Sequence, residues 1–589
     1  MAKTLFLSSL ILLGNSIDSL AQLSVQWAQC YGGPSVELGL SIIETSDGGY
    51  VMNGFASSEG GQVQGHHGGA DVWIVRVTSD GTLAWQRCLG GSLDETYSTI
   101  IPGTDSGYIV LTRTASTDGD VTGHNGDTDL WIIKLNDAGG IEWKYCLGGN
   151  GSEYSSQFPS IRPTIDGGYI IAGTSSSTNG SFSTNHGQLD AWAIKLSSSG
   201  IVEWQRLYGG TMDDGAHHVL TLEDGGYLLL GYTTSPNTGD VSGWHGESDI
   251  WVLRLDASGN IVWQKCLGGA ESDSGESLLS LTDDSGFIVG GEVNYSTPGN
   301  HGDITGYHGE FDVWIVKLDA FGNLIWENCL GGDDSDLLRG LGSWATPLLE
   351  MGNGNILVSA NTGSSNNSGD VQGHNGNYDY WLIELNAAGA IVNSVCQGST
   401  GFEGEADWSP MVLTDNPNTH LLFGTSTIDL DNPSTTDIVC SSFTLGGGSI
   451  WTQVLGGSSM DYATCAIRKS NGSIALCGTT SSNDGLFAQQ NSGEMDTWIL
   501  ELDMSSSINC CNALDFSMQP NPATSHVNVS CAQGLVRRFR LLDINGRVVA
   551  AGNPAAQRFV IERKGLSPGT YLVELELEHG RAMRKLMLD

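Results

Sequence analysis

Residues 129–149 read DLWIIKLNDAGGIEWKYCLGG and contain the two marks that decide the fold. A unit bearing these marks returns about every sixty residues, a period that predicts a propeller, a solenoid or an array. The first mark is Asp-x-Trp, and its copies are Asp71/Trp73, Asp129/Trp131, Asp190/Trp192, Asp249/Trp251, Asp312/Trp314, Asp379/Trp381 and Asp496/Trp498, with Asp437 and Val439 in an eighth copy. The second is Trp-x-x-x-x-Gly-Gly, with Cys at the fourth position in most copies; its tryptophans are Trp27, Trp85, Trp143, Trp204, Trp263, Trp326 and Trp451, with Asn393 in the remaining copy.

Each unit contains four short runs of alternating apolar residues, separated by Gly, Asn, Asp and Ser, which predicts four β-strands per unit. The chain enters on a fourth-type strand, residues 24–30, and leaves on a third-type strand, residues 496–503. Pairing these two segments completes the last blade and removes an exposed edge, whereas a solenoid needs no such complementary ends. We therefore expect an all-β fold, an eight-bladed β-propeller closed by its N-terminal strand.

Composition divides the chain of 589 residues into segments. Residues 1–21 have the charge, the apolar run and the small-residue site of a secretory signal peptide, and no later run is long enough to span a bilayer. Residues 22–504 form the expected propeller, 505–513 a linker and 514–589 a small C-terminal domain. We expect the mature chain to be exported through the periplasm, and to be secreted or held at the outer-membrane surface.

Charge follows the same division. Residues 1–511 hold 15 basic and 59 acidic side chains, whereas residues 512–589 hold 10 basic and 7 acidic ones. The acidic surface argues against binding to nucleic acid or to anionic lipid by charge.

Eleven of the twelve cysteines fall into two groups. Six recur at one place in the fourth strands, and the spacing of stacked sheets makes bridges between blades impractical; they are Cys30, Cys88, Cys146, Cys266, Cys329 and Cys396. Five break the pattern, namely Cys465, Cys477, Cys510, Cys511 and Cys531. A bridge from the closing blade to the linker is conceivable in an oxidising compartment, but sequence leaves the connectivity open.

Several motifs follow one another in the tail. They are Pro520-Asn521-Pro522, residues 526–529 (HVNV), residues 540–547 (RLLDINGR) with Gly546 and Arg547, Pro568-Gly569 with Tyr571, and residues 584–588 (RKLML). This series resembles the type A C-terminal sorting domain of the Bacteroidota type IX secretion system. The resemblance implies a small β-sandwich that an outer-membrane translocon recognises and that is usually removed on export. The propeller units resemble repeats found in proteins with such tails, and that resemblance implies no activity.

The loop before Asp-x-Trp often contains histidine, at His67, His124, His186, His245, His308 and His374. A group repeated in every blade is expected to join loop to strand through buried hydrogen bonds, because buried polar groups need partners. An alternative is a calcium site at Asp120 and Asp129, although their spacing does not match an EF-hand loop. No other cofactor is expected.

An acid stands four residues after the second glycine of the second mark in seven copies, and in the eighth Glu403 stands four residues after Ser399, which replaces that glycine. These acids are Glu37, Glu95, Glu153, Asp214, Asp273, Asp336 and Asp461. They either cap neighbouring amides, the interpretation we favour, or form a carboxylate ring that binds a cation or ligand at the mouth of the propeller.

Aromatic residues fall beside these acids. Trp344, Trp408, Tyr97 and Phe158 begin innermost strands, where with Glu95, Asp214, Asp273 and Asp336 they would suit sugar binding, or would simply fill a wider core. The propeller lacks known catalytic motifs, so no catalytic residue is assigned. We expect a monomeric binding module for a glycan or protein ligand; the alternative is a propeller-type glycoside hydrolase or lyase.

Overall fold

The computed structural model covers the propeller and the tail. It describes residues 23–154, 160–179, 182–294, 302–338, 347–374, 376–398, 402–403, 411–413, 420–427, 436–444, 448–488, 490–503, 516–519, 525–531, 535–542, 548–577 and 580–588. The chain separates into two compact units, residues 22–504 and residues 505–589 with 1–21. The predicted signal peptide and linker, Phe158, Trp344, Trp408, Pro520, Asn521, Pro522, Gly546 and Arg547 lie outside the described residues.

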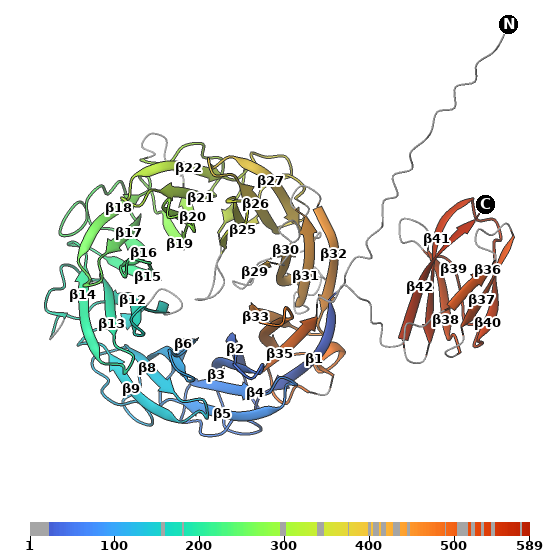
Figure 1. Ribbon diagram of the computed structural model, residues 1–589, viewed down its shortest axis with the longest axis horizontal. Coiled ribbons are helices and arrows are strands. Elements are labelled where there is room, and N and C mark those ends of the chain that lie inside the picture. Colours follow the sequence, from blue (N-terminus) through green and yellow to red (C-terminus); the bar gives the residue numbers. More distant parts are fainter. Residues whose placement is uncertain are drawn as a thin grey trace, which may run out of the picture. The chain divides into compact units, whose positions relative to one another are not determined.

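Eight antiparallel sheets surround one axis in the propeller (Figure 1). From the innermost strand outward, blade 1 is β2 (Glu37–Glu44), β3 (Tyr50–Ala56), β4 (Asp71–Val77) and β5 (Leu83–Leu89). Blade 2 is β6 (Glu95–Pro102), β7 (Tyr108–Thr114), β8 (Asp129–Leu135) and β9 (Ile141–Leu147). Blade 3 is β10 (Glu153–Tyr154) with β11 (Ser160–Pro163), β12 (Tyr169–Ser175), β13 (Asp190–Leu196) and β14 (Val202–Tyr208). Blade 4 is β15 (Asp214–Thr221), β16 (Tyr227–Thr233), β17 (Asp249–Leu255) and β18 (Ile261–Leu267).

The remaining blades repeat this order. Blade 5 is β19 (Ser274–Ser280), β20 (Phe287–Asn294), β21 (Phe311–Leu318) and β22 (Leu324–Leu330). Blade 6 is β23 (Asp336–Leu337) with β24 (Leu348–Glu350), β25 (Ile356–Thr362), β26 (Asp379–Leu385) and β27 (Ile391–Gln397). Blade 7 is β28 (Phe402–Glu403) with β29 (Met411–Leu413), β30 (His420–Thr427), β31 (Thr436–Thr444) and β32 (Gly448–Leu455).

Blade 8 joins the two ends of the propeller. It is β33 (Asp461–Arg468), β34 (Ile474–Thr480), β35 (Asp496–Asp503) and, outermost, β1 (Ser24–Tyr31), with a 3₁₀ turn at Gly485–Phe487. Strand β1 pairs antiparallel with β35, with Ser24 opposite Asp503 and Tyr31 opposite Thr497. The prediction of eight blades closed by the N-terminal strand is confirmed.

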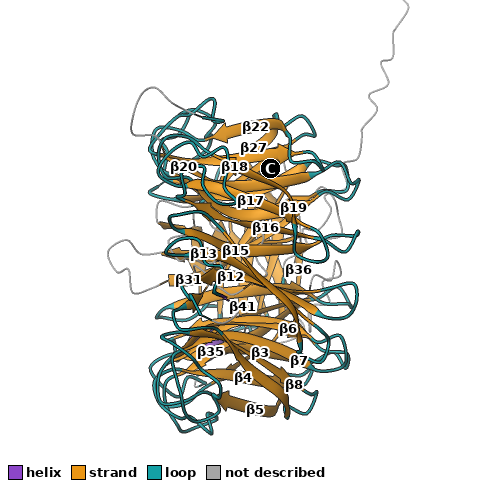
Figure 2. Cartoon of the chain, turned by 90° about the vertical axis from the view of Figure 1, so that its left-hand side faces the viewer, coloured by secondary structure: helices purple, strands orange, loops and turns teal. Residues whose placement is uncertain are grey.

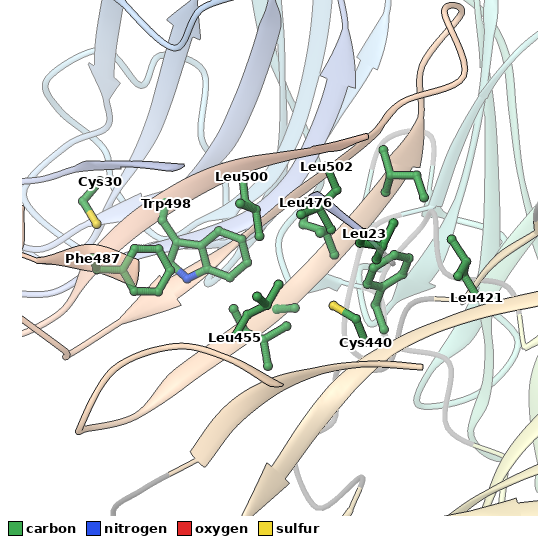
Figure 3. Close-up of a cluster of buried hydrophobic side chains, with 14 residues drawn as sticks. Leu23, Cys30, Leu421, Cys440, Leu455, Leu476, Phe487, Trp498, Leu500 and Leu502 are labelled. Atoms are coloured by element: carbon green, nitrogen blue, oxygen red, sulfur yellow. The ribbon is translucent and has the colours of Figure 1, made fainter. Parts of the chain in front are cut away.

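The hydrophobic core is a ring of interfaces between neighbouring sheets, which stand side by side in Figure 2. At the interface of blades 7 and 8, Trp498 packs on Phe487 with ring centroids 5.5 Å apart, and Leu500 and Leu502 continue the apolar row (Figure 3). The middle strands are buried on both faces, as in β4, where all residues are buried. The alternation expected from the sequence thus marks which neighbouring blade a side chain contacts, because the sheets are covered on both sides.

The tail forms two small sheets with one core. One sheet is β36 (Phe516–Gln519), β37 (His526–Cys531) and β40 (Arg558–Glu562); the other is β39 (Val548–Gly552), β38 (Arg538–Leu542), β41 (Gly569–Leu577) and β42 (Gly580–Leu588). Val527 of β37 packs in one cluster with Leu541 of β38 and Val573 of β41, so the sheets face each other. This confirms the expected small β-sandwich. Pro568-Gly569 leads into β41, and buried Tyr571 donates its hydroxyl to the Ser567 carbonyl at 2.9 Å.

Candidate functional site

The acids that follow the double glycine hold the connections between blades. Glu95 is fully buried at the start of β6, where it accepts the Gly91 amide at 2.9 Å and the Thr114 hydroxyl at 2.6 Å. The same amide bond, at 2.6–2.7 Å, recurs at Glu37, Glu153, Asp214, Asp273, Asp336 and Asp461. Asp214, Asp273 and Asp336 are likewise buried, so these carboxylates are directed into the blades and cap their own connections.

The Asp-x-Trp aspartates anchor the preceding loop. Asp71 accepts both the backbone amide of His67, at 2.7 Å, and its ring Nδ1, at 3.0 Å. In five other blades an equivalent loop amide donates a hydrogen bond to the aspartate. The donors are Asn125, His186, His245, His308 and Ser492, and their acceptors are, in the same order, Asp129, Asp190, Asp249, Asp312 and Asp496. The expected link from loop to strand is therefore present. His124 makes no such bond, because Asn125 occupies the donor position in its blade; His374, like His124, lies one residue earlier in its loop than His67 does.

The tryptophans of both marks pack between elements. Trp73 is buried and donates its indole N–H to Gln86 at 2.8 Å, and the tryptophans at Trp131, Trp192, Trp251, Trp314, Trp381 and Trp498 are also fully buried. In the second mark, the Trp85 indole reaches across to the Asp137 carbonyl of blade 2 at 3.1 Å. Its ring lies against Gly139, whose φ of 76° and missing side chain permit the contact. Equivalent bonds to a carbonyl of the next blade are made by Trp27, Trp204, Trp263 and Trp326.

The two acidic motifs meet at six of the described blade boundaries, a pairing that sequence analysis did not reveal. Asp71 follows a loop of blade 1, and Glu95 begins blade 2. A Cβ atom added to Gly90 would lie less than 3.0 Å from the carboxyl groups of both residues. The same holds for the glycines Gly32, Gly148, Gly209, Gly331 and Gly456, each between an Asp-x-Trp aspartate, or Asp437, and the following acid. The first glycine of each pair is therefore a spacer between two carboxyl groups.

Burial and mutual proximity change the protonation of these pairs. Burial, reinforced by the charge of Asp496, raises the pKa of Glu37 to about 7. Burial also raises the pKa of Asp129 to about 7, with a contribution from Glu153. Two close carboxylates in a buried site disfavour double ionisation. Each of these pairs therefore retains a proton at mildly acidic pH.

The proposed calcium ligands lie at two different boundaries. Asp120 donates its amide to the Gly90 carbonyl at 2.7 Å, and its carboxylate is 3.7 Å from both His67 Nε2 and Lys144 Nζ. Asp129 is buried beside Gly148 and accepts the Asn125 amide at 3.0 Å. Across the described part of the chain, no cluster of three or more His, Cys, Asp or Glu side chains is arranged to hold a metal ion.

A solvent-exposed tyrosine departs from the eightfold pattern. Tyr97 is 43% exposed and has a φ of 55°, a left-handed conformation that is unusual for a bulky side chain. It lies in a bulge of β6 that omits Tyr97 and Ser98 from the ladder, whereas the bulges of β2, β15, β19 and β33 omit one residue each. Strained non-glycine residues cluster at ligand sites.

The Tyr97 ring stacks on an arginine. The Arg113 guanidinium lies 4.4 Å from the centroid of Tyr97 and 5.6 Å from that of Tyr154 in the next blade. The equivalent position lies one residue before the residue that pairs with the Asp-x-Trp aspartate. In other blades it holds Phe55, Thr174, Tyr232, Glu292, Asn361 and Thr479. Burial lowers the pKa of Arg113, but an arginine remains charged at neutral pH. Tyr97, Arg113 and Tyr154, named here the arginine–tyrosine cluster, form the candidate ligand site.

Comparison with known families identifies the C-terminal tail. Residues 517–589 match the sequence model of the secretion system C-terminal sorting domain. The tail is such a sorting domain, of the type IX system. A chain carrying it is exported and is either secreted or attached to the cell surface. In the described residues, no helix is both long and apolar enough to cross a membrane.

Other comparisons show only distant likeness. A search of curated proteins finds no match. Among solved structures, a mutant of Synechocystis apocarotenoid oxygenase is 11% identical, with a TM-score of 0.36, 74% of this chain covered and 93% of that chain. A puromycin hydrolase is 12% identical, with a TM-score of 0.36 and coverage of 75% and 58%. Hydrazine synthase from Kuenenia stuttgartiensis is 12% identical, with a TM-score of 0.34 and coverage of 69% and 96%.

Proposed function

We propose that the propeller is an extracellular binding module and that the arginine–tyrosine cluster binds an acidic glycan. The observation that carries this proposal is the exposed, strained Tyr97 stacked on Arg113, at a place where the other blades differ. Contacts that recur in the repeat hold neighbouring blades together. An exposed aromatic ring at a place where the repeat is broken does not serve that structural purpose.

The chemistry of the cluster favours an anionic sugar. An exposed tyrosine ring offers an apolar face on which a sugar ring stacks. Stacking engages the faces of the guanidinium, while its N–H donors lie in the plane and match a carboxylate or sulfate. In a chain with a net charge of −41, a cation at this position selects for an anionic group that the rest of the surface repels.

A glycan array of uronic, sulfated and neutral sugars, probed with the full chain, tests the proposal. We expect binding to acidic sugars that Tyr97→Ala weakens at least about tenfold, the equivalent of about 1.4 kcal/mol. Arg113→Lys should also weaken it, because the bidentate geometry is lost while the charge is kept. Tyr145→Ala is the matched control, since Tyr145 is equally exposed at 43% but lies on outer strand β9.

Three results would contradict the proposal. Equal affinity of the Tyr97, Arg113 and Tyr145 variants would place the site elsewhere. Capture of an extracellular protein with no sugar bound would assign a protein ligand. Turnover of a polysaccharide by the parent chain would make the propeller an enzyme.

A further inference from the structure

Two buried cysteines face each other across the hairpin of the closing blade. Cys465 of β33 is the direct antiparallel partner of Cys477 of β34. Both are buried and unbonded thiols in the structure. They lie in the cluster between blades 8 and 1, together with Ile42 and Ile499.

The register places the two side chains within bonding range. Residues directly opposite in an antiparallel ladder have Cα atoms about 4.5–5.5 Å apart, and their side chains lie on the same face. A disulfide requires a Cα separation of about 4.4–6.8 Å. Closing the bond therefore requires a rotation of side chains and no movement of the backbone.

The other cysteines on described strands lack this arrangement. Cys88, Cys266 and Cys329 lie opposite the tryptophans Trp73, Trp251 and Trp314. Cys440 lies opposite Gln453 and Phe423. Within the part of the chain that the structure describes, Cys465 and Cys477 are the one cysteine pair in register.

We propose that Cys465 and Cys477 form a disulfide once the chain leaves the cytoplasm. The sorting domain directs the chain to the exterior, and disulfides persist in such compartments. In the reaction, the two thiols lose two protons and two electrons and one Sγ–Sγ bond forms. A thiol–disulfide oxidoreductase accepts the electrons, and its own disulfide is reduced to two thiols.

Burial sets the order of events. Thiol–disulfide exchange needs an accessible thiolate, and burial raises the pKa of Cys477 in the folded blade. The bond should therefore form while the hairpin is still open to solvent, before blade 1 covers it. Afterwards the same burial protects the bond from reduction.

The bond would support the closing seam of the ring. Thr464, the bulged neighbour of Cys465, donates its hydroxyl to the Gly39 carbonyl of blade 1 at 2.8 Å. A covalent link at this bulge fixes the register of β33 on β34, and thereby the position of the Thr464 donor. The two ends of the propeller then meet against a fixed edge.

Mass spectrometry of the exported full chain, purified without reductant, tests the bond directly. The chain is unfolded in the presence of an alkylating reagent and digested with trypsin and an Asp-specific protease. Cleavage at Arg468, Lys469 and before Asp461 and Asp484 separates residues 461–468 from 470–483. We expect these peptides to appear joined and unalkylated. Recovery of both as alkylated single peptides, or joined to other cysteines, would overturn the proposal.

Variants measure the consequence for stability. The loop between Cys465 and Cys477 is short, but a disulfide that closes it still stabilises the folded chain by restricting the unfolded one. In a propeller of about 480 residues, we expect Cys465→Ala/Cys477→Ala to lower the Tm by about 3 °C. Cys266→Ala is the control, since Cys266 is equally buried and faces Trp251. A bond present without any Tm difference from the control would refute the stabilising role and leave the bond itself standing.

Discussion

Gly148 separates two buried carboxyl groups, and replacing it with alanine should destabilise the propeller. A Cβ at this position would lie less than 3.0 Å from both Asp129 and Glu153. The backbone conformation itself tolerates a side chain, because the φ of Gly148 is not in the left-handed region. The expected cost is therefore steric.

The magnitude follows from overpacking in a closed site. Both neighbours are held by hydrogen bonds, Asp129 by the Asn125 amide at 3.0 Å and Glu153 by the Gly149 amide at 2.7 Å. Neither carboxyl can move without breaking a buried bond. Overpacking of this kind costs about 1–3 kcal/mol. With about 2.1 cal/mol/K per residue over about 480 residues, the Tm should fall by about 1–3 °C.

Scanning calorimetry of three chains measures the effect. Gly352→Ala is the control, because nothing lies within 4 Å of its added Cβ and its backbone is ordinary. That control should be neutral or stabilising by up to about 1 kcal/mol, through the unfolded chain. A Gly148→Ala variant with the same Tm as Gly352→Ala would refute the paired-carboxyl description of the blade boundary.

Four further predictions concern the closing strand, the buried carboxyl pairs, calcium binding and the tail. Deleting residues 24–30 should expose the edge of β35 and cause aggregation, seen by size-exclusion chromatography; a monomeric, equally stable variant would contradict closure by β1. The folded-state pKa values of Glu37, Asp129 and Asp273 are raised to about 7, so the protonated carboxyls contribute stability that is fully present below about pH 4 and is lost as the pH rises through about 7. The Tm should therefore fall between pH 5 and pH 8. A Tm that does not change over this range would contradict the raised pKa values. Because Asp120 and Asp129 lie at different boundaries, millimolar calcium should leave the Tm unchanged; a rise would reveal a site through mass action. Truncation at Ser507 should leave a folded propeller inside the periplasm, and normal export of that chain, measured by fractionation, would contradict a sorting role for the tail.

Much of the fold was predictable because it repeats. The period fixed the blade count, and the complementary strand types at residues 24–30 and 496–503 predicted the closure. Local capping by acids such as Glu95 was also predictable, since its donor Gly91 is only four residues away. These inferences needed contacts within one unit or between the two ends of the chain.

Contacts between blades were not predictable in the same way. Asp71 and Glu95 belong to motifs that look independent in sequence, and only the packing of one sheet on the next brings their carboxyl groups together beside Gly90. Tyr97 was named from its position, but Arg113 was missed. A comparison of the aligned copies would have found it, because an arginine there replaces Phe55 of blade 1 and Tyr232 of blade 4.

The antiparallel pairing of β1 with β35 has a mechanical consequence. Ser24 and Asp503 lie opposite each other, so the chain enters and leaves the propeller at the same end of this seam. A pull between those two points loads one pair of residues at a time, and each hydrogen bond contributes only about 1 kcal/mol. The seam between β1 and β35 therefore opens one residue pair at a time at modest force, whereas the hairpins inside the other blades carry none of this load. It can also reseal from Tyr31 back toward Ser24 once the pull ends.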